Sequence, residues 1–379
     1  MTAITVFVTL CALGLYTVVG YPLLLGWMAR RWPSPVQKRE YQPALSFVIP
    51  VHNGANYLAA KLESILALDY PRELLEVMVV SDGSTDATDD ITRGFAVRGV
   101  QLLRVPKGGK PAALNAAVPL THNEILVLTD VRQLLAPESV RKLVANFADP
   151  RVGVVSGDLL IRQGSLEETS VGAYWRYERR IRANLGRLDS IMGATGAFYA
   201  MRRALFRQMP RELLLDDMYL PMGAFLEGYR LVVEPEAQAF DFPTDVSIEF
   251  RRKVRTLAGN YQLLRYYPWL LTLRNRMLFH FISYKLLRLL LPWIALALLI
   301  VCFGLPEPWR TIVLGGQLGI YGLAALDGVS PSSAPWRRIT APLRTVVSML
   351  LAAACAVSIL FVKPHKLWTP TQLPPKAGP

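Results

Sequence analysis

Two glycine-containing polar segments have residue types that could bind a nucleotide. Asp82 ends an apolar run, and a carboxylate at the end of a strand can accept hydrogen bonds from a base or a ribose. The Ser, Thr and Asp residues that follow it are also typical helix caps. Gly109 and Lys110 precede a helical segment, where backbone amides, an ammonium group and the helix dipole could bind phosphate. The Walker A spacing is missing, and glycines with a lysine also occur in ordinary surface turns.

Three further charged segments could take part in transfer chemistry. Asp130 closes another apolar run, where a carboxylate could hold a divalent cation that bridges a diphosphate, but Arg132 stands where a second oxygen ligand would be useful. Asp216 and Asp217 form an acidic pair, and one of them could be a general base; the start of an exposed helix explains such a pair equally well. The basic run 251–255 could neutralise a pyrophosphate leaving group or lie on a membrane surface.

Residues 40–260 have the pattern of a scaffold that would position these side chains. Short β-branched runs alternate with helix-like segments long enough to be crossovers, which predicts a mostly parallel sheet in an α/β domain. Ligands of such sheets bind at the carboxyl ends of the strands, where Asp82, Lys107 and Asp130 are expected. The predicted strands are Ser46–Val51, Val77–Ser81, Val100–Val105, Ile125–Asp130 and Val152–Ser156.

The composition indicates an anionic partner and a membrane. Apolar residues make up 52% of the 379 residues, charged residues make up 19%, and the net charge is 42 − 29 = +13. Phosphates, acidic lipids and nucleic acid all fit such a charge. No recognition motif of a nucleic-acid-binding protein is present, so we expect no nucleic-acid partner. The three cysteines and four histidines share no metal-ligand spacing, which gives no support to a zinc site or a disulfide framework.

Several apolar segments approach the length of about 20 residues that a helix needs to cross a bilayer. Residues 1–29 carry no charge and are followed by basic residues; this order favours an anchor over a cleaved signal peptide and places residue 30 onward in the cytoplasm. Of the later segments Leu286–Leu305, Thr311–Leu326 and Val346–Val362, two or three are expected to span. The expected domains are an anchor (1–29), a cytoplasmic domain (40–265), an interfacial helix region (266–285), a C-terminal membrane region (286–366) and a flexible tail (367–379).

The helix-like segment Thr169–Arg187 mixes aromatic, basic and acidic residues. Its tryptophan and tyrosines suit a bilayer interface, where they could form a platform for an acceptor. The same segment could equally be a helix packed on the sheet, with Arg–Glu pairs on its solvated face. Of the two interpretations, we favour the packed helix.

Taken in order along the chain, the polar segments resemble those of the family 2 glycosyltransferases, the inverting membrane group that includes cellulose, chitin and hyaluronan synthases. The resemblance covers residues 44–265 and continues into the membrane segment at 283–293. It rests on Val48-Ile49-Pro50-Val51-His52-Asn53, Asp82-Gly83-Ser84, Gly109-Lys110 with Ala113-Leu114-Asn115, Asp130, Gly193-Ala194-Thr195-Gly196-Ala197, Arg202-Arg203, Asp216-Asp217 and the basic segment 251–255. It implies a GT-A-type nucleotide-sugar-binding fold flanked by transmembrane helices.

The resemblance also assigns roles to these residues. Asp217 matches the family's catalytic base, Asp82 binds the nucleoside, and Asp130 lies by the diphosphate, the sugar and a divalent metal, Mg or Mn. Donor binding is implied for Pro50, His52, Asn53, Asp82, Lys110, Asp130, Arg252 and Arg255, and acceptor binding for Gly193, Ala194, Thr195, Gly196 and Asp216. In this arrangement Asp217 deprotonates an acceptor hydroxyl, which displaces the nucleotide in one step and inverts the anomeric carbon.

Two positions depart from the family's pattern. Arg132 replaces the second aspartate of D-x-D, which removes one expected metal ligand. Thr256 replaces the tryptophan of the Q-x-x-R-W element, which forms an aromatic platform at the channel mouth of the polymer synthases. Both departures favour the alternative of a catalytically degenerate scaffold or export subunit, whereas the presence of Asp82, Asp130 and Asp217 argues against it.

The sequence therefore predicts a membrane-anchored inverting glycosyltransferase. Its expected donor is a nucleotide-sugar, with a UDP-sugar favoured, and its expected acceptor is a glycan or a lipid-linked glycan. Extracellular polysaccharide or glycolipid biosynthesis is the expected process, in which polysaccharide assembly or export partners could take part. We expect a multi-pass protein of the inner (plasma) membrane with a cytoplasmic catalytic domain.

Overall fold

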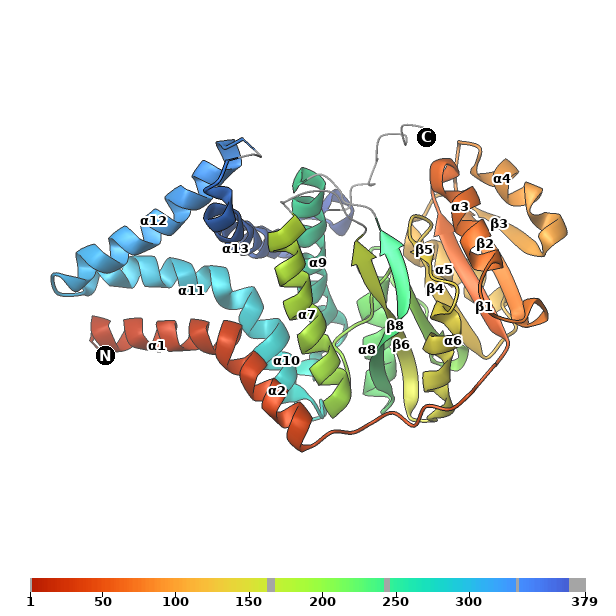
Figure 1. Cartoon of the computed structure of the whole chain (residues 1–379), viewed down its shortest axis with the longest axis horizontal. Coiled ribbons are helices and arrows are strands. Elements are labelled where there is room, and N and C mark those ends of the chain that lie inside the picture. The colour runs from red at the N-terminus through yellow and green to blue at the C-terminus, as the bar shows by residue number, and fades with distance from the viewer. Residues whose placement is uncertain (1, 162–167, 242–245, 332–333, 368–379) are drawn as a thin grey trace. The chain divides into compact units, whose positions relative to one another are not determined.

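The computed structural model describes residues 2–161, 168–241, 246–331 and 334–367. Its contacts divide the chain into two compact units (Figure 1). The sheet unit comprises Trp32–Gln163, Arg182–Thr244 and Pro370–Pro379, and the helix unit comprises Met1–Arg31, Gly164–Ile181 and Asp245–Thr369. One helix, α7 (Glu168–Leu188), contributes residues to both units.

The sheet unit is built on an eight-stranded sheet with the strand order β3-β2-β1-β4-β7-β6-β8-β5. Its strands are Leu45–Val51 (β1), Leu75–Asp82 (β2), Val100–Val105 (β3), Ile125–Thr129 (β4), Leu134–Leu135 (β5), Val152–Ile161 (β6), Phe198–Arg202 (β7) and Arg230–Asp241 (β8). The first four strands pair in parallel, whereas β7 is antiparallel to both β4 and β6. All five predicted strands are present, and the mostly parallel mixed sheet confirms the expected fold class.

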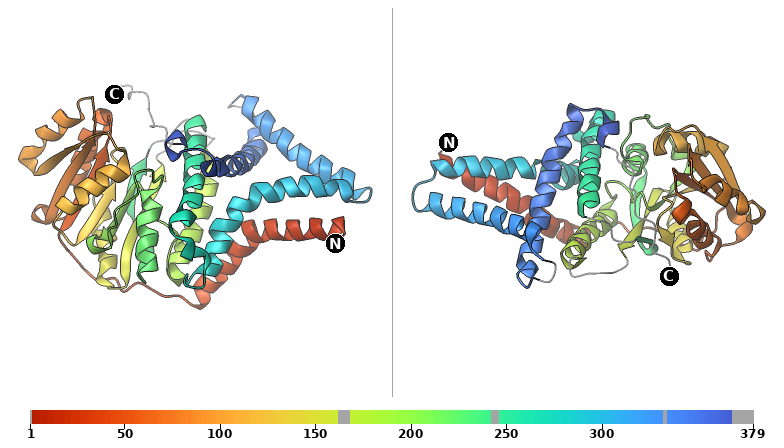
Figure 2. Two further views of the ribbon diagram at one scale, coloured as in Figure 1. Left: turned by 180° about the vertical axis from the view of Figure 1, so that it is seen from behind. Right: turned by 90° about the horizontal axis from the view of Figure 1, so that it is seen from above.

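The core lies on both faces of this sheet. Phe47, Val48 and Ile49 are consecutive in β1 and each is 0% exposed. Because successive side chains of a strand point to opposite faces, both faces are covered, which explains why these strands are continuous apolar runs. The helices that pack on the sheet are α3 (Ala55–Leu66), α4 (Thr88–Gly94), α5 (Lys110–Ala117), α6 (Ser139–Val144) and α8 (Asp216–Leu226) (Figures 1 and 2).

The helix unit contains four helices long and apolar enough to cross a membrane, within the part of the chain that the structure describes: Ala3–Arg31, Leu278–Gly304, Trp309–Val329 and Arg337–Leu360. The first combines α1 (Ala3–Leu15), the π-helical turn η1 (Tyr16–Gly20) and α2 (Tyr21–Arg31). The second combines α10 (Leu278–Phe281), the π-helical turn η8 (Ile282–Leu286), α11 (Leu287–Val301) and η9 (Cys302–Gly304). The third is α12 (Trp309–Val329), and the fourth is α13 (Arg337–Ala356) with η10 (Val357–Leu360). Large apolar side chains face outward along them, as a lipid-facing surface requires.

Residues 266–285 differ from the single interfacial helix that the sequence predicts. α9 (Val246–Tyr266) ends at their first residue, the 3₁₀ turn η7 (Pro268–Leu271) follows, and the second apolar helix already begins at Leu278. The side chain of Asn275 forms the turn between them, because it donates to the Leu270 carbonyl (2.9 Å) and accepts from the Met277 amide (2.9 Å). Residues 368–379 of the expected tail lie outside the described residues.

Candidate functional site

The predicted donor residues that follow β1 are hydrogen-bonded to the turn that follows β2. The Asn53 amide donates to Ser84 Oγ (3.1 Å), and Asn53 Oδ1 accepts from the Thr85 amide (2.8 Å). Asn53 has a φ of +52°, a left-handed conformation that asparagine adopts more readily than most residues. His52 Nδ1 lies 2.7 Å from the Asp82 carbonyl oxygen, so this ring nitrogen carries the proton. The two strand ends therefore form one rigid surface.

Asp82 holds the glycine loop in place. Its Oδ1 accepts from the Gly108 amide (2.7 Å) and its Oδ2 from the Gly109 amide (2.9 Å). Gly83, next to Asp82, has a φ of +60°, and a Cβ there would lie 2.8 Å from Lys107. Only glycine fits this position. Each carboxylate oxygen has a second lone pair, so binding of a base or ribose by Asp82 stays a prediction beside this structural role.

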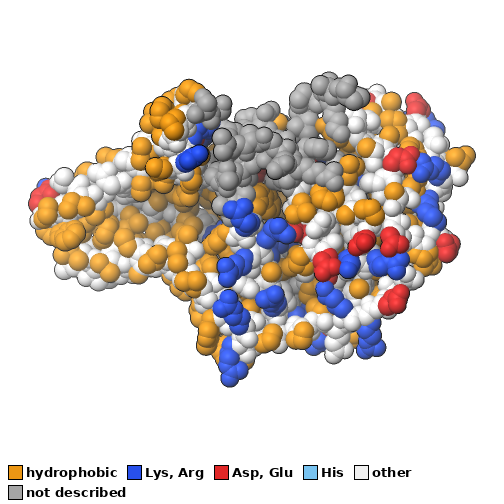
Figure 3. Space-filling model, in the orientation of Figure 1, with side chains coloured by type: hydrophobic (Ala, Val, Ile, Leu, Met, Phe, Trp, Pro, Cys, Tyr) orange, Lys and Arg blue, Asp and Glu red, His pale blue; other side chains and the backbone are white. Residues whose placement is uncertain are grey.

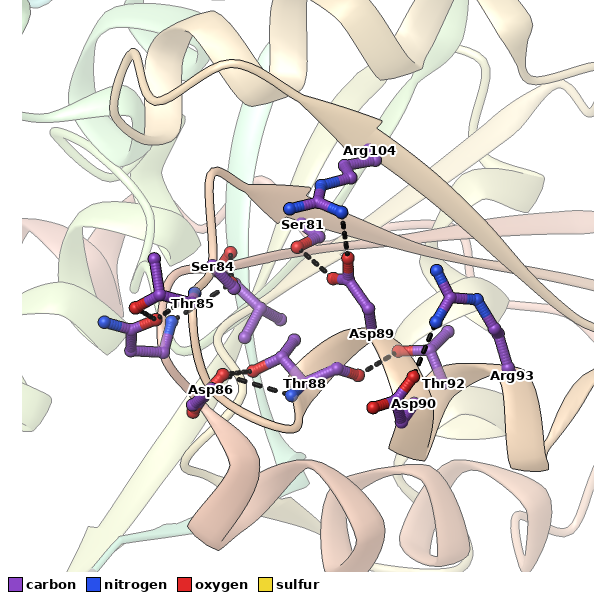
Figure 4. Close-up of polar contacts among 12 residues, drawn as sticks. Ser81, Ser84, Thr85, Asp86, Thr88, Asp89, Asp90, Thr92, Arg93 and Arg104 are labelled. Carbon is purple, nitrogen blue, oxygen red and sulfur yellow. Dashed lines mark hydrogen bonds and ion pairs between the residues drawn. The ribbon is translucent and has the colours of Figure 1, made fainter.

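The acidic residues that follow Asp82 serve the local structure (Figure 4). Asp86 accepts from the amide and hydroxyl of Thr88 (3.1 and 2.5 Å) at the start of α4 and from the Ala55 amide (2.9 Å) at the start of α3. Asp89 pairs with Arg104 (3.3 Å). Helix capping, the alternative left open by the sequence, therefore explains Asp86.

Lys110 joins carboxylates from two different elements. Its Nζ lies 2.8 Å from Asp130 Oδ1, just after β4, and 3.1 Å from Asp216 Oδ1, at the start of α8. Burial lowers the pKa of Lys110, but Asp130, Asp216 and Asp217 outweigh burial and raise it, so the ammonium stays charged. The hydroxyl of Tyr199 donates to the other oxygen of Asp216 (3.3 Å).

Asp217 is held by the glycine turn that precedes β7. Its Oδ2 accepts from the Gly196 amide (2.9 Å), and its backbone carbonyl accepts from the Ala194 amide (2.7 Å). A Cβ at Gly196 would lie 2.9 Å from Asp217 Oδ2, so this approach requires glycine. Burial and the charge of Asp216 raise the pKa of Asp217 from 3.8 to about 6. A carboxylate with this pKa accepts a proton near neutral pH more readily than an ordinary aspartate.

The turn 193–196 wraps around the start of α8. Gly193 has a φ of +113°, and a Cβ there would lie 3.0 Å from Met218 Cγ. On the opposite side the Thr195 amide donates to Ser156 Oγ (3.0 Å). The structure thus brings the predicted acceptor residues and the predicted base together.

A buried lysine, Lys61, supports the turn after β4 through hydrogen bonds. Lys61, on α3, is 0% exposed, and its Nζ donates to Thr129 Oγ1 (2.7 Å) and to the Gln133 carbonyl (2.6 Å). Burial lowers the pKa of Lys61 to about 7, although Asp130 opposes this shift. The two hydrogen bonds fix both ends of the turn that carries Asp130.

Arg132, two residues after Asp130, forms an ion pair with Asp241 at the end of β8. The same carboxylate accepts from Gln133 Nε2 (2.9 Å). An ion pair therefore occupies the position where a D-x-D motif has its second free carboxylate.

Residues 46–209 match the family model described as glycosyl transferase family 2. They form a family 2 glycosyltransferase domain. The match includes Asp82, Lys110 and Asp130 and ends just before the acidic pair at the start of α8. The predicted resemblance to family 2 glycosyltransferases, which rested on the order of the motifs, is confirmed.

Two curated relatives illustrate the similarity. A beta-monoglucosyldiacylglycerol synthase from Nostoc sp. is 29% identical over 285 residues, which cover 70% of this chain and 59% of the relative. A poly-beta-1,6-N-acetyl-D-glucosamine synthase from Staphylococcus epidermidis is 21% identical over 249 residues, which cover 61% of this chain and 58% of the relative. The match therefore spans about three fifths of the length of these relatives.

The fold is also similar to that of a solved structure, the mannosyltransferase PcManGT from Pyrobaculum calidifontis in complex with GDP-Man and Mn²⁺. The TM-score is 0.72 at 23% sequence identity, over 94% of this chain and 99% of that chain. At this identity the similarity concerns the fold, which is the GT-A-like fold that the sequence predicts.

The family 2 domain offers a divalent cation few ligands of its own. Within the described residues, no group of three or more His, Cys, Asp or Glu side chains could hold a metal ion. Asp130 supplies one carboxylate at the predicted position, and one of its oxygens accepts from Lys110. Mg²⁺ is commonly held by one or two carboxylates together with substrate phosphates. The residues present therefore fit a cation only where a diphosphate completes its coordination.

Three predicted donor residues lie on elements other than those that carry this cluster. Pro50 lies in β1, where it pairs with Val80 of β2. Arg252 and Arg255 lie on α9 in the helix unit, where Arg252 lies 3.5 Å from Glu249. Donor binding by all three stays a prediction.

Sequence reasoning missed three side chains that support the site: Lys61, Tyr199 and Asp241. Lys61 left a signal, because it interrupts the apolar stripe formed by Leu58, Leu62 and Ile65 on α3. Tyr199 and Asp241 lie on strands that the sequence did not predict, so no pattern linked them to the acidic residues.

Proposed function

We propose that this chain is an inverting glycosyltransferase that moves a sugar from a nucleotide-sugar to a hydroxyl group of a glycan or lipid-linked acceptor. The observation that carries the proposal is the setting of Asp217. It is a partly buried carboxylate with a raised pKa, fixed by the Gly196 amide, beside an ammonium that joins two further carboxylates. The family 2 domain supports the same reaction class.

In this mechanism Asp217 accepts the proton of the acceptor hydroxyl as its oxygen attacks the anomeric carbon. Attack from the face opposite the nucleotide gives inversion in a single displacement. With a pKa of about 6, Asp217 is mostly ionised at neutral pH and still basic enough to take the proton. The amides that hold the turn 193–196 keep the carboxylate oriented, and the same turn borders the acceptor.

The leaving diphosphate needs positive charge, and Lys110 is the first source of it. Its ammonium already spans the gap between Asp130 and Asp216, so a bound diphosphate would compete with these carboxylates for it. Mg²⁺ or Mn²⁺ held by Asp130 and the diphosphate would supply further charge, as the Mn²⁺ and GDP-Man in PcManGT suggest. Arg252 and Arg255 complete the proposed donor site, with a UDP-sugar as the favoured donor.

We place the reaction at the cytoplasmic face of the inner membrane. Four apolar helices support membrane insertion, and Arg30 and Arg31 directly follow the first apolar segment, as expected for a cytoplasmic flank. The relatives make a glucosyldiacylglycerol and a poly-N-acetylglucosamine, so a lipid or a growing glycan at the membrane is the proposed acceptor.

The test is sugar transfer by the detergent-purified chain, measured as nucleotide release with UDP-, GDP- and TDP-sugars and a membrane lipid extract, with Mg²⁺, Mn²⁺ or chelator. Asp217→Asn should lower transfer by about 10²–10⁴-fold, the usual contribution of a general base, and leave nucleotide binding unchanged. Asp90→Asn is the matched control, because Asp90 is an exposed aspartate whose partner is Arg93.

Normal transfer by Asp217→Asn would disprove the assignment of Asp217 as the general base.

The ion pair of Arg132 and Asp241 favours a second candidate function, that of a catalytically inactive scaffold. A chain that neither binds nucleotides in calorimetry nor releases them with any donor would support the scaffold instead.

A further inference from the structure

The outward face of α7 in the helix unit is rich in arginine. Arg176, Arg179 and Arg180 are all exposed, whereas Tyr177 is half-buried and Glu178 is buried on the other side of the helix. Figure 3 shows Lys and Arg side chains gathered in a column along α7. Like charges three and four residues apart on a helix destabilise it, so this face gains stability from an anionic partner.

The inward face of α7 attaches it to two of the four apolar helices. The Tyr177 hydroxyl donates to the Val18 carbonyl (2.8 Å) in the π-helical turn η1. Glu178 forms an ion pair with Arg288 at the start of α11 and accepts from the Tyr284 hydroxyl (2.8 Å) in η8. At Tyr177 and Glu178 the segment is a packed helix, but it packs on apolar helices instead of the predicted sheet, and its Arg–Glu pair is buried instead of lying on a solvated face.

These attachments set the depth of α7 in a bilayer. Val18 lies 15 residues after Ala3, where the first apolar helix begins, and Arg288 lies 16 residues before Gly304, where the second ends. At a rise of 1.5 Å per residue both distances are roughly 22–24 Å, compared with a hydrocarbon core of about 30 Å. Both partners of α7 therefore lie near the same edge of the core, and long arginine side chains on its outward face would reach the lipid headgroups.

We propose that Arg176, Arg179 and Arg180 form a binding surface for the phosphate groups of anionic membrane lipids. Arginine binds phosphate through two parallel N–H donors, and the spacing of Arg176 and Arg180 places them on one face of the helix. Within the described residues, no ion pair involves Arg176 or Arg180. The inference rests on the membrane placement of the proposed function, and it adds a lipid class that the chain recognises independently of its substrates.

The test is lipid selection by the full chain without any donor. The protein is reconstituted into vesicles of equal parts phosphatidylglycerol and phosphatidylcholine, re-extracted, and its retained lipids are counted by native mass spectrometry. The wild type should retain an excess of phosphatidylglycerol. Arg176→Gln/Arg180→Gln should reduce the ratio of the two affinities by roughly 25-fold, since each arginine near an anionic surface contributes about a factor of five. Arg176→Lys/Arg180→Lys should keep most of the excess, and high salt should remove it.

Arg93→Gln/Arg104→Gln is the matched control, because it removes two exposed arginines from the sheet unit. The proposal is wrong if the glutamine variant on α7 keeps the wild-type excess, or if the control loses as much. Asp217→Asn separates this inference from the proposed function: lipid selection by that variant should be unchanged, whether or not the chain transfers sugar.

Discussion

Clustered charged side chains are arranged differently in the two units. In the sheet unit, a single ammonium, that of Lys110, faces Asp130 and Asp216, and Asp217 lies beside them. In the helix unit, Glu178 pairs with Arg288, one charge against one. The first cluster has more acid than base, whereas in the second the single carboxylate is matched by Arg288, with Lys285 as a further cation nearby.

The first arrangement is typical of a reactive site, and the second of a structural joint, by which we mean the ion pair that attaches α7 to α11. Burial and the charge of Asp216 raise the pKa of Asp217, and the excess of carboxylates suits cationic or proton-donating partners, which a substrate can provide. The Glu178 pair is already complete, since Tyr284 donates to the same carboxylate. Removing a charge from the first cluster should therefore change activity, and removing one from the second should change stability.

Lys110→Met should have the largest effect, a loss of transfer of roughly 10³-fold, because the leaving diphosphate loses a preorganised cation. The remaining carboxylates would also repel one another, which should raise the pKa of Asp217 and move the pH profile to higher pH. Steady-state transfer assays over a pH series measure both effects. Lys142→Met is the control, as Lys142 is a partly exposed lysine paired with Glu236. An unchanged pH profile with reduced activity would mean that Lys110 does not act on Asp217.

Glu178→Gln should destabilise the helix unit by about 3–5 kcal/mol, since it leaves the charge of Arg288 buried without its partner. Thermal unfolding in detergent, followed by tryptophan fluorescence, measures the loss. Glu178→Gln/Arg288→Met should recover much of it, because replacing both charges removes the unpaired one. Nucleotide binding should stay near normal in both variants. A stable Glu178→Gln protein would contradict the role of this pair as a joint.

The pH dependence of wild-type transfer should show an acidic limb with a midpoint of about 6, the pKa of Asp217. Below it, kcat/KM should fall tenfold per pH unit as the base becomes protonated. Stability should change in the opposite sense: the folded chain holds this proton more tightly than a free aspartate, so ionisation from pH 3.8 to about 6 lowers stability. Asp216→Asn should move the activity limb to lower pH, and a limb that stays in place would show that another group titrates.

The sequence predicted the parallel half of the sheet more completely than the antiparallel half. β1, β2 and β4 are largely apolar runs buried on both faces, so each was recognisable without its neighbours. β7 and β8 obtain their places from pairing with distant strands, and β8 mixes buried with half-buried and exposed residues over Arg230–Asp241 without a regular alternation. Long-range pairing of this kind leaves little local signal.

The same distinction holds within the site. Asp82, Lys110 and Asp130 follow strands or open helices in order, so their spacing indicated a ligand-binding edge. The partners of Arg132 and Asp216 could not be read in this way, because Asp241 lies 109 positions after Arg132 and Tyr199 lies on an unpredicted strand. The candidate residues could therefore be found from their neighbours in the sequence. The partners that set the charge balance of the cluster could not, because they are distant in the sequence.

Lys61→Met should have the smallest effect and tests whether buried charge behind the site acts on activity or on stability. The change removes hydrogen bonds to Thr129 and Gln133 but also removes the cost of burying an ammonium, so stability should change by only about 1 kcal/mol. The turn that carries Asp130 would loosen, and the donor KM should rise severalfold while the acceptor KM stays constant. Lys142→Met again serves as control. A rise in both KM values, or a large loss of stability with normal kinetics, would mean that Lys61 stabilises the fold, as Glu178 does, and does not support donor binding.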